Sequence, residues 1–168
     1  MNITTNVDTV IAQLRQYRDK LNERIHTMLQ RLAAIGVDTA DVAFKTAQYD
    51  GDNDVVVNAP EWISDTQLII SATGSAVTFI EFGSGVHYVK QHPKAVQLGA
   101  IRGGYGKGRG KRDTWGYYGN PGTNGRTVPG KAGLVLTHGN PPARAMYDAG
   151  KEMRERVTEI AREVFAHG

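Results

Sequence analysis

The sequence has no cysteine among its 168 residues, and aromatic residues make up only 8% of it. Without cysteine there is no disulfide framework, no Cys-ligated zinc site and no thiol nucleophile. Long apolar runs are also missing, because none approaches the roughly 18–20 residues of a membrane-spanning helix. We therefore expect no membrane partner. Residues 1–6 are neither basic nor apolar, so we also expect no signal peptide.

Acidic residues are scarce in one part of the chain. Between residues 86 and 133 there are nine Lys or Arg and a single acid, Asp113, which gives this segment a net charge of +8. The rest of the chain has 11 basic and 16 acidic residues, a net charge of −5. Fifteen of the 20 glycines lie between Gly83 and Gly139. The sequence therefore indicates one ordinary domain, residues 1–168, interrupted by a basic, glycine-rich segment.

Apolar periodicity predicts a long helix at each end of the chain. In residues 7–35 apolar side chains recur at steps of three and four, with charged residues on the opposite face. Asn6 or Thr5 is a suitable N-cap, and Gly36 suits the position just after the helix. A helix of this length would measure about 43 Å, so we expect part of it to project, kink or pack on a partner. Residues 143–166 are predicted to form the second helix.

Strand signals fill the region between the helices. Alternation and β-branched residues predict strands within 42–82, including 42–49, 67–72 and 76–82. The last two are expected to be joined by a hairpin turn at 73–75. Residues 83–133 are predicted to be a flexible loop, and 134–137 a short return strand. The expected fold class is α+β, with both helices packed on a small, mainly antiparallel sheet. A loop of this length is usually functional, or ordered only when bound.

Three segments together resemble a known group of proteins. These are residues 77–85, with Glu-Phe-Gly-Ser-Gly at the end, residues 115–118, and residues 137–149, with His-Gly-Asn-Pro-Pro near the start. Their order and spacing resemble the tail-completion, or head–tail joining, proteins of long-tailed bacteriophages and prophages, often labelled minor capsid or minor tail proteins. The motif residues are Glu81, Phe82, Gly83, Gly85, His138, Gly139, Pro141, Pro142 and Met146. One departure is the segment 143–146, Ala-Arg-Ala-Met, where the family usually has Pro-Phe-(Leu/Met).

The resemblance implies a structural virion component of the neck, made in the bacterial host cytoplasm. Such a subunit forms a homo-oligomeric ring that completes the tail or joins it to the capsid connector. Its implied partners are further copies of itself, the connector or head-closure protein, and a tail-terminator or tail-tube protein. Genomic DNA passes through the channel of such a ring and is a further possible contact.

The motif residues are expected to have structural roles. We expect Gly83 and Gly85 to end a strand at a sharp turn, since glycine tolerates positive φ. Pro141 and Pro142 are expected to fix the entry angle of the last helix. Two roles are open for Glu81: an edge-strand charge that discourages mispairing, or a salt bridge to a neighbouring subunit.

The basic segment is the predicted contact surface for a partner. Its candidate residues are Arg102, Tyr105, Lys107, Arg109, Lys111, Arg112, Trp115, Tyr117 and Tyr118. They could contact DNA through phosphates and base stacking, dock on a partner ring, or form a mobile loop that orders on assembly. The alternative function for the whole chain is a small basic nucleic-acid-binding protein.

Catalytic and metal-binding patterns are weak. Asp50, Asp52 and Asp54 alternate as at the start of a calcium loop, but Gly51 is wrongly placed for one. Three histidines, His87, His92 and His138, could reach one metal ion, yet no carboxylate pattern accompanies them. The Gly-Ser-Gly at 83–85 lacks the nucleophile-elbow pattern, and the glycine run lacks Gly-Lys-(Ser/Thr). We expect no metal, no cofactor and no enzymatic activity.

Overall fold

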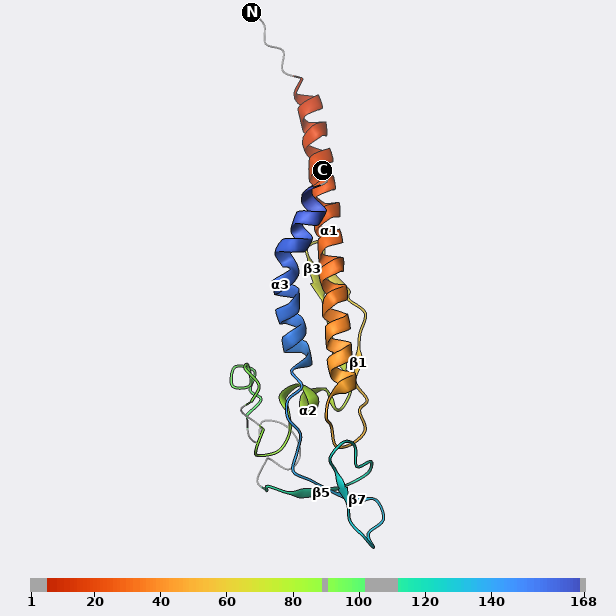
Figure 1. Ribbon diagram of the computed structural model, residues 1–168. Coiled ribbons are helices and arrows are strands. Elements are labelled where there is room, and N and C mark those ends of the chain that lie inside the picture. Colours follow the sequence, from red (N-terminus) through yellow and green to blue (C-terminus); the bar gives the residue numbers. More distant parts are fainter. Residues whose placement is uncertain (1–5, 89–90, 102–111, 167–168) are drawn as a thin grey trace, which may run out of the picture.

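The computed structural model describes residues 6–88, 91–101 and 112–166, and it has the expected α+β fold. Two helices, α1 (Val7–Thr46) and α3 (Ala145–Ala166), lie side by side and run in opposite directions (Figure 1). A short helix, α2 (Val77–Phe82), lies beside the N-terminal end of α3. The strands occupy the connections between the helices.

The strands form three small antiparallel sheets and not one continuous sheet. β1 (Val56–Val57) pairs with β4 (Ala72–Thr73), and β2 (Glu61–Ser64) pairs with β3 (Gln67–Ile69). In the third sheet β7 (Leu134–Thr137) is central, between β5 (Trp115–Tyr118) and β6 (Arg126–Thr127). The return strand expected at 134–137 is β7. The prediction of a loop over all of 83–133 is wrong, because β5 and β6 lie within it.

Helix α1 is longer than predicted and absorbs a predicted strand. It has 40 residues, about 60 Å at 1.5 Å per residue, and continues through Gly36 to Thr46. The expectations that Gly36 follows the helix and that 42–49 is a strand are both wrong. A Cβ on Gly36 would lie 2.5 Å from Ile70 Cδ1 and 2.7 Å from Met153 Sδ, so glycine lets these side chains approach the helix backbone. Ala40 and Phe44, one turn apart, are buried and extend the apolar face.

Residues 76–82 were predicted to be a strand, but the structure has α2 there. The local sequence favours a strand, and tertiary contacts override that preference. Ala76 and Ile80, four residues apart and linked by a hydrogen bond from the Ile80 N–H to the Ala76 carbonyl (2.9 Å), are both fully buried. The Asp54 carboxylate accepts hydrogen bonds from the backbone N–H groups of Ser75 (2.7 Å) and Ala76 (2.9 Å). The hairpin predicted at 73–75 is therefore absent, and β4 pairs back to β1.

The main core lies where α1 ends, α3 begins and α2 crosses between them. Its fully buried members are Ala40, Phe44, Ala76, Ile80, Ala145 and Ala149. Because four of the six are alanines, the three helices approach closely at this point. This packing fixes the positions of the segments at 81–85 and 138–142, which join α2 and α3 to the strands.

The other end of α1 has no such packing. Every residue from Val7 to Lys20 is exposed, and α1 extends well beyond the C-terminal end of α3 (Figure 1). The ion pair of Arg31 with Glu163, near the end of α3, shows how far α3 reaches along α1. The expectation that part of this helix projects is confirmed. Of the helices in the described ranges, none has an apolar stretch long enough to cross a bilayer.

Candidate functional site

The two longest motif segments lie against each other through their backbones. The Ser84 N–H donates to the Asn140 carbonyl (2.8 Å), and the Asn140 N–H donates to the Ser84 carbonyl (3.2 Å). A Cβ on Gly139, where φ is +95°, would overlap the Ser84 carbonyl oxygen. A Cβ on Gly83 would lie 2.8 Å from the Asn140 oxygen. The glycines are therefore required by a close crossing of two chains and not by a simple turn. We call residues 81–85 with 138–142 the motif junction.

The third motif segment joins the same place. A Cβ on Gly85 would lie 2.5 Å from the His138 carbonyl oxygen and 3.0 Å from the Trp115 ring. The His138 Nδ1 lies 2.9 Å from the Thr114 hydroxyl, next to Trp115. All three segments that resemble the phage family thus meet around one point, although the first and the last are about 50 residues apart in the sequence.

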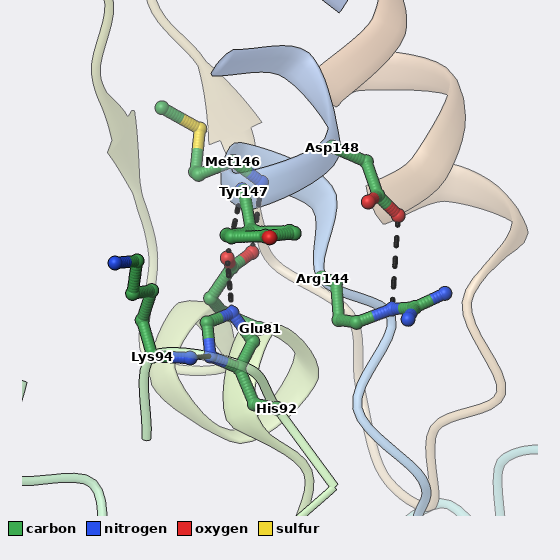
Figure 2. Close-up of polar contacts among 7 residues, drawn as sticks. All are labelled: Glu81, His92, Lys94, Arg144, Met146, Tyr147 and Asp148. Atoms are coloured by element: carbon green, nitrogen blue, oxygen red, sulfur yellow. Dashed lines mark hydrogen bonds and ion pairs between the residues drawn. The ribbon is translucent and has the colours of Figure 1, made fainter. Parts of the chain in front are cut away.

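Glu81 caps helix α3 from outside that helix. Its carboxylate accepts hydrogen bonds from the backbone N–H groups of Met146 (2.8 Å) and Tyr147 (3.0 Å), the second and third residues of α3 (Figure 2). These are the donors that an N-cap side chain normally satisfies. Arg144, the residue before α3, cannot accept them, so Glu81 supplies the cap, and its negative charge suits the helix N-terminus.

Both roles expected for Glu81 are therefore wrong in this structure. Its side chain is buried, so it is neither an edge-strand charge nor a surface ion pair with another subunit. Its remaining partner is His92, whose Nε2 lies 3.2 Å from the Glu81 carboxylate. The His92 Nδ1 accepts a hydrogen bond from the Lys94 N–H (3.0 Å), which leaves Nε2 to donate to Glu81. Phe82 and Tyr147 pack edge-on against this ring, which completes the burial.

The segment that departs from the family pattern is adapted to the junction. The Ala143 N–H donates to the Ile80 carbonyl (2.8 Å), a hydrogen bond that proline could not make. Arg144 has a positive φ of 57°, and its N–H donates to the Glu81 carbonyl (3.2 Å). Pro141 and Pro142 are half-buried beside it and lead directly into α3. Two backbone hydrogen bonds to α2 thus fix the segment that leads into α3.

A cavity of about 360 Å³ opens beside the motif junction. Its walls come from the loop after α1 (residues 49–52), from α2, from β5 and the residues that follow it, and from residues 137–140. The rings of Tyr49, Trp115 and Tyr117 line it, together with the carboxylates of Asp50 and Asp52. The motif segments contribute to this concave site, and we take it as the candidate binding site.

The cavity is electrically negative. Burial, followed by the charges of Asp54, Asp50 and Asp52, raises the pKa of Tyr49 above its usual 10.0. Burial, and then the charge of Asp50, likewise raises the pKa of Tyr117. Neither phenol therefore ionises at neutral pH. The acids that surround these two rings disfavour any further negative charge in the cavity.

The predicted partner-contact residues fall into two groups. Arg102, Tyr105, Lys107, Arg109 and Lys111 lie outside the described residues. Arg112 is exposed, Trp115 and Tyr117 are half-buried in the cavity wall, and Tyr118 is 77% exposed. All three of these aromatic residues border the cavity. Trp115 and Tyr117 share one face of β5, whereas Tyr118 lies on the other face and is mostly exposed, because side chains alternate along a strand.

The acidic and histidine candidates for a metal have separate partners. Asp50 accepts from Thr137 and Asn124, whereas Asp54 accepts from Ser75 and Ala76. His92 is bonded to Glu81, and His138 to Thr114. In the described part of the chain, no three His, Asp or Glu side chains gather in an arrangement that could hold a metal ion.

Sequence reasoning missed three residues of the cavity: Asp50, Asp52 and Asn140. The two acids drew attention only as a calcium pattern, and Asn140 only as the variable position within His-Gly-Asn-Pro-Pro. No local signal links them, because the cavity joins segments about 90 residues apart in the sequence. Comparisons with known protein families, with curated proteins and with solved structures found nothing that matches this chain.

Proposed function

We propose that this protein is a structural subunit of the head–tail junction of a long-tailed phage. In this function it forms a ring that completes the tail or joins it to the capsid connector. The observation that supports the proposal best is the uncovered apolar face at the projecting end of α1. We call it the α1 stripe, and its members are Val7, Val10, Ile11, Leu14 and Tyr17.

The α1 stripe has the pattern of a helix face that packs against another surface. Its members follow one another at steps of three, one, three and three residues, so they share one side of the helix. Leu14 is 63% exposed and Tyr17 is 66% exposed. A contiguous exposed apolar patch is typical of a protein–protein contact. The chain thus has an assembly surface that its own fold leaves bare.

A ring of identical copies is the arrangement that the resemblance implies, and it would cover such a face. In a ring, the stripe of one subunit packs on a different surface of the next, and closure leaves no stripe exposed. The connector or head-closure protein and a tail-terminator or tail-tube protein are the proposed neighbours above and below the ring. The location that follows is the virion neck.

Convergence of the motif segments also supports this proposal. The residues that carry the resemblance are distant in the sequence, yet Glu81, Gly85, Trp115 and Gly139 meet at one junction. A shared junction gives a physical reason for the three motifs to occur together. We therefore favour a common structural origin for the resemblance over a chance match of three short turn sequences.

A gene deletion tests the proposal in particles. Negative-stain microscopy of the deletion strain is expected to show filled heads and separate finished tails. Tails of uncontrolled length would assign the chain to tail termination instead, and normal virions would contradict a junction role altogether. A second strain that lacks only residues 102–112 is expected to make folded protein but fewer joined particles.

The alternative function is nucleic-acid binding, and the +8 charge of residues 86–133 favours it. In the described part of this segment, Arg112 and Tyr118 are both exposed. Binding through phosphates weakens steeply as salt rises. Tight, salt-dependent binding of duplex or single-stranded DNA by the isolated chain, together with normal virions from the deletion strain, would favour this function over the first.

A further inference from the structure

The cavity beside the motif junction is acidic. Among the described residues, its lining contains the carboxylates of Asp50 and Asp52 but no Lys, Arg or His. Within the described ranges, neither carboxylate forms an ion pair. Asp50 is almost fully buried and accepts only from neutral donors, the Asn124 N–H (2.7 Å) and the Thr137 hydroxyl (2.5 Å). A buried carboxylate without a countercharge is costly, so a cationic ligand would stabilise the site.

Asn140 borders the same cavity. The residue is 2% exposed, and no donor in the described part of the chain reaches its Oδ1. The side-chain NH₂ faces the Ser84 hydroxyl at 3.3 Å. The Oδ1 itself is buried and not open to the cavity, so the acceptors that a ligand would meet are those of the two carboxylates.

Aromatic rings complete the wall. Tyr49, Trp115 and Tyr117 come from two segments and present π surfaces beside the carboxylates. Ring faces attract cations, and a planar guanidinium both stacks on a ring and donates up to five hydrogen bonds. A calcium or magnesium ion takes oxygen ligands and would gain nothing from these rings. The combination of rings and carboxylates therefore matches a guanidinium group better than such an ion.

We propose that this cavity binds the guanidinium group of an arginine side chain presented by a partner polypeptide. A volume of about 360 Å³ is at the lower end for ligand sites, which suits one long side chain. Tyr118, exposed at the end of the same strand, offers a surface for the residues that flank the arginine. The proposal does not depend on a role in phage assembly, since it rests only on the chemistry of the cavity.

Tryptophan fluorescence can test this proposal directly. The chain has two tryptophans, of which Trp115 lines the cavity, whereas Trp62 lies on β2 against His26. A Trp62→Phe variant of the full chain therefore reports on the cavity alone. It is titrated with acetyl-Gly-Arg-Gly-amide and with the matching peptide in which neutral citrulline replaces arginine. We expect saturable binding of the arginine peptide and at least about tenfold weaker binding of the citrulline peptide.

Two matched variants locate the binding. Asp52→Asn keeps the shape of the side chain and an oxygen for its hydrogen bond from Asn120 (3.0 Å), but removes the charge. We expect it to weaken the arginine peptide about tenfold. Asp65→Asn, an equally exposed change in the turn between β2 and β3, is expected to leave the affinity unchanged. Circular dichroism confirms that each variant is folded.

Four results would overturn the proposal. Equal affinity for the arginine and citrulline peptides would mean that charge is not recognised. Equal affinity for N-ethylguanidinium and the arginine peptide would make the ligand a free small cation and not a polypeptide. Saturation of the Trp115 signal by calcium chloride, with competition against the peptide, would make the cavity a metal site. Absence of any signal at the highest soluble peptide concentration would mean that the cavity does not bind arginine.

Discussion

The motif junction and the projecting end of α1 differ in where their contacts come from: the first is satisfied within the chain, and the second is left exposed. At the junction, backbone groups of Ser84 and Asn140 pair with each other, and the first free N–H groups of α3 pair with Glu81. At the other end of the molecule, Leu14 and its apolar neighbours meet only solvent. The junction is therefore complete within one chain, whereas the α1 stripe requires a second molecule. Substitutions should affect folding at the first place and assembly at the second.

The largest expected effect is that of Gly139→Ala. A Cβ there overlaps the Ser84 carbonyl, and φ is +95°, so the two chains of the junction must move apart. We expect a loss of about 4 kcal/mol in the free energy of unfolding, measured by urea denaturation. Gly130→Ala is the matched control, since φ is similar at +74° but no atom lies within 4 Å. It should cost only about 1 kcal/mol, and equal losses would refute the close crossing.

A somewhat smaller effect is expected for Glu81→Ala. This change leaves two N–H groups of α3 and the His92 ring nitrogen without their acceptor in a buried site. We expect a loss of about 3 kcal/mol, again by urea denaturation. Glu81→Gln keeps one carbonyl oxygen for the cap and should lose about half as much. An Ala variant as stable as the wild type would show that α3 does not need this cap.

Asp54→Asn tests a weaker contact, the one that starts α2. Hydrogen bonds from the N–H groups of Ser75 and then Ala76 lower the pKa of Asp54 below its usual 3.8. A group with a lowered pKa in the folded state stabilises the protein above its unfolded pKa, and this contribution is lost as pH falls through the folded value. The variant should therefore be less stable than the wild type at pH 7, and the gap should close below about pH 4. Thermal unfolding across this pH range measures it. A gap that does not change with pH would contradict the charged contact.

No effect on folding is expected at the α1 stripe. In dilute solution, below the concentration at which the oligomer forms, Leu14→Glu replaces a side chain that is 63% exposed, so the free energy of unfolding of the single chain should stay within about 0.5 kcal/mol of the wild type. Hydrogen exchange under the same dilute conditions compares the two ends of α1. Amides of residues 7–20 in the single chain should exchange through local fraying, well before those of the α1 segment around Phe44.

Apolar periodicity predicted both long helices and the strand at 134–137, but it missed β2, β5 and β6. It failed at 76–82, where an alternating apolar pattern suits a strand but Asp54, distant in the sequence, holds the backbone of Ser75 and Ala76 at the start of a helix. It also placed Gly36 outside α1, because the pattern does not reveal that Ile70 and Met153 need the missing Cβ. The cap formed by Glu81 and the acceptors of the cavity could not be predicted, because each depends on segments that meet only in the folded chain.

The central claim, that the bare stripe of α1 is an assembly surface, is tested most directly by native mass spectrometry of the purified chain. The account predicts a closed oligomer for the wild type and a monomer for Leu14→Glu. It also predicts an unchanged oligomer for Val42→Glu, a control on the same helix where valine is 60% exposed outside the stripe. A wild-type chain that stays monomeric at high concentration, or an oligomer that survives Leu14→Glu, would contradict it.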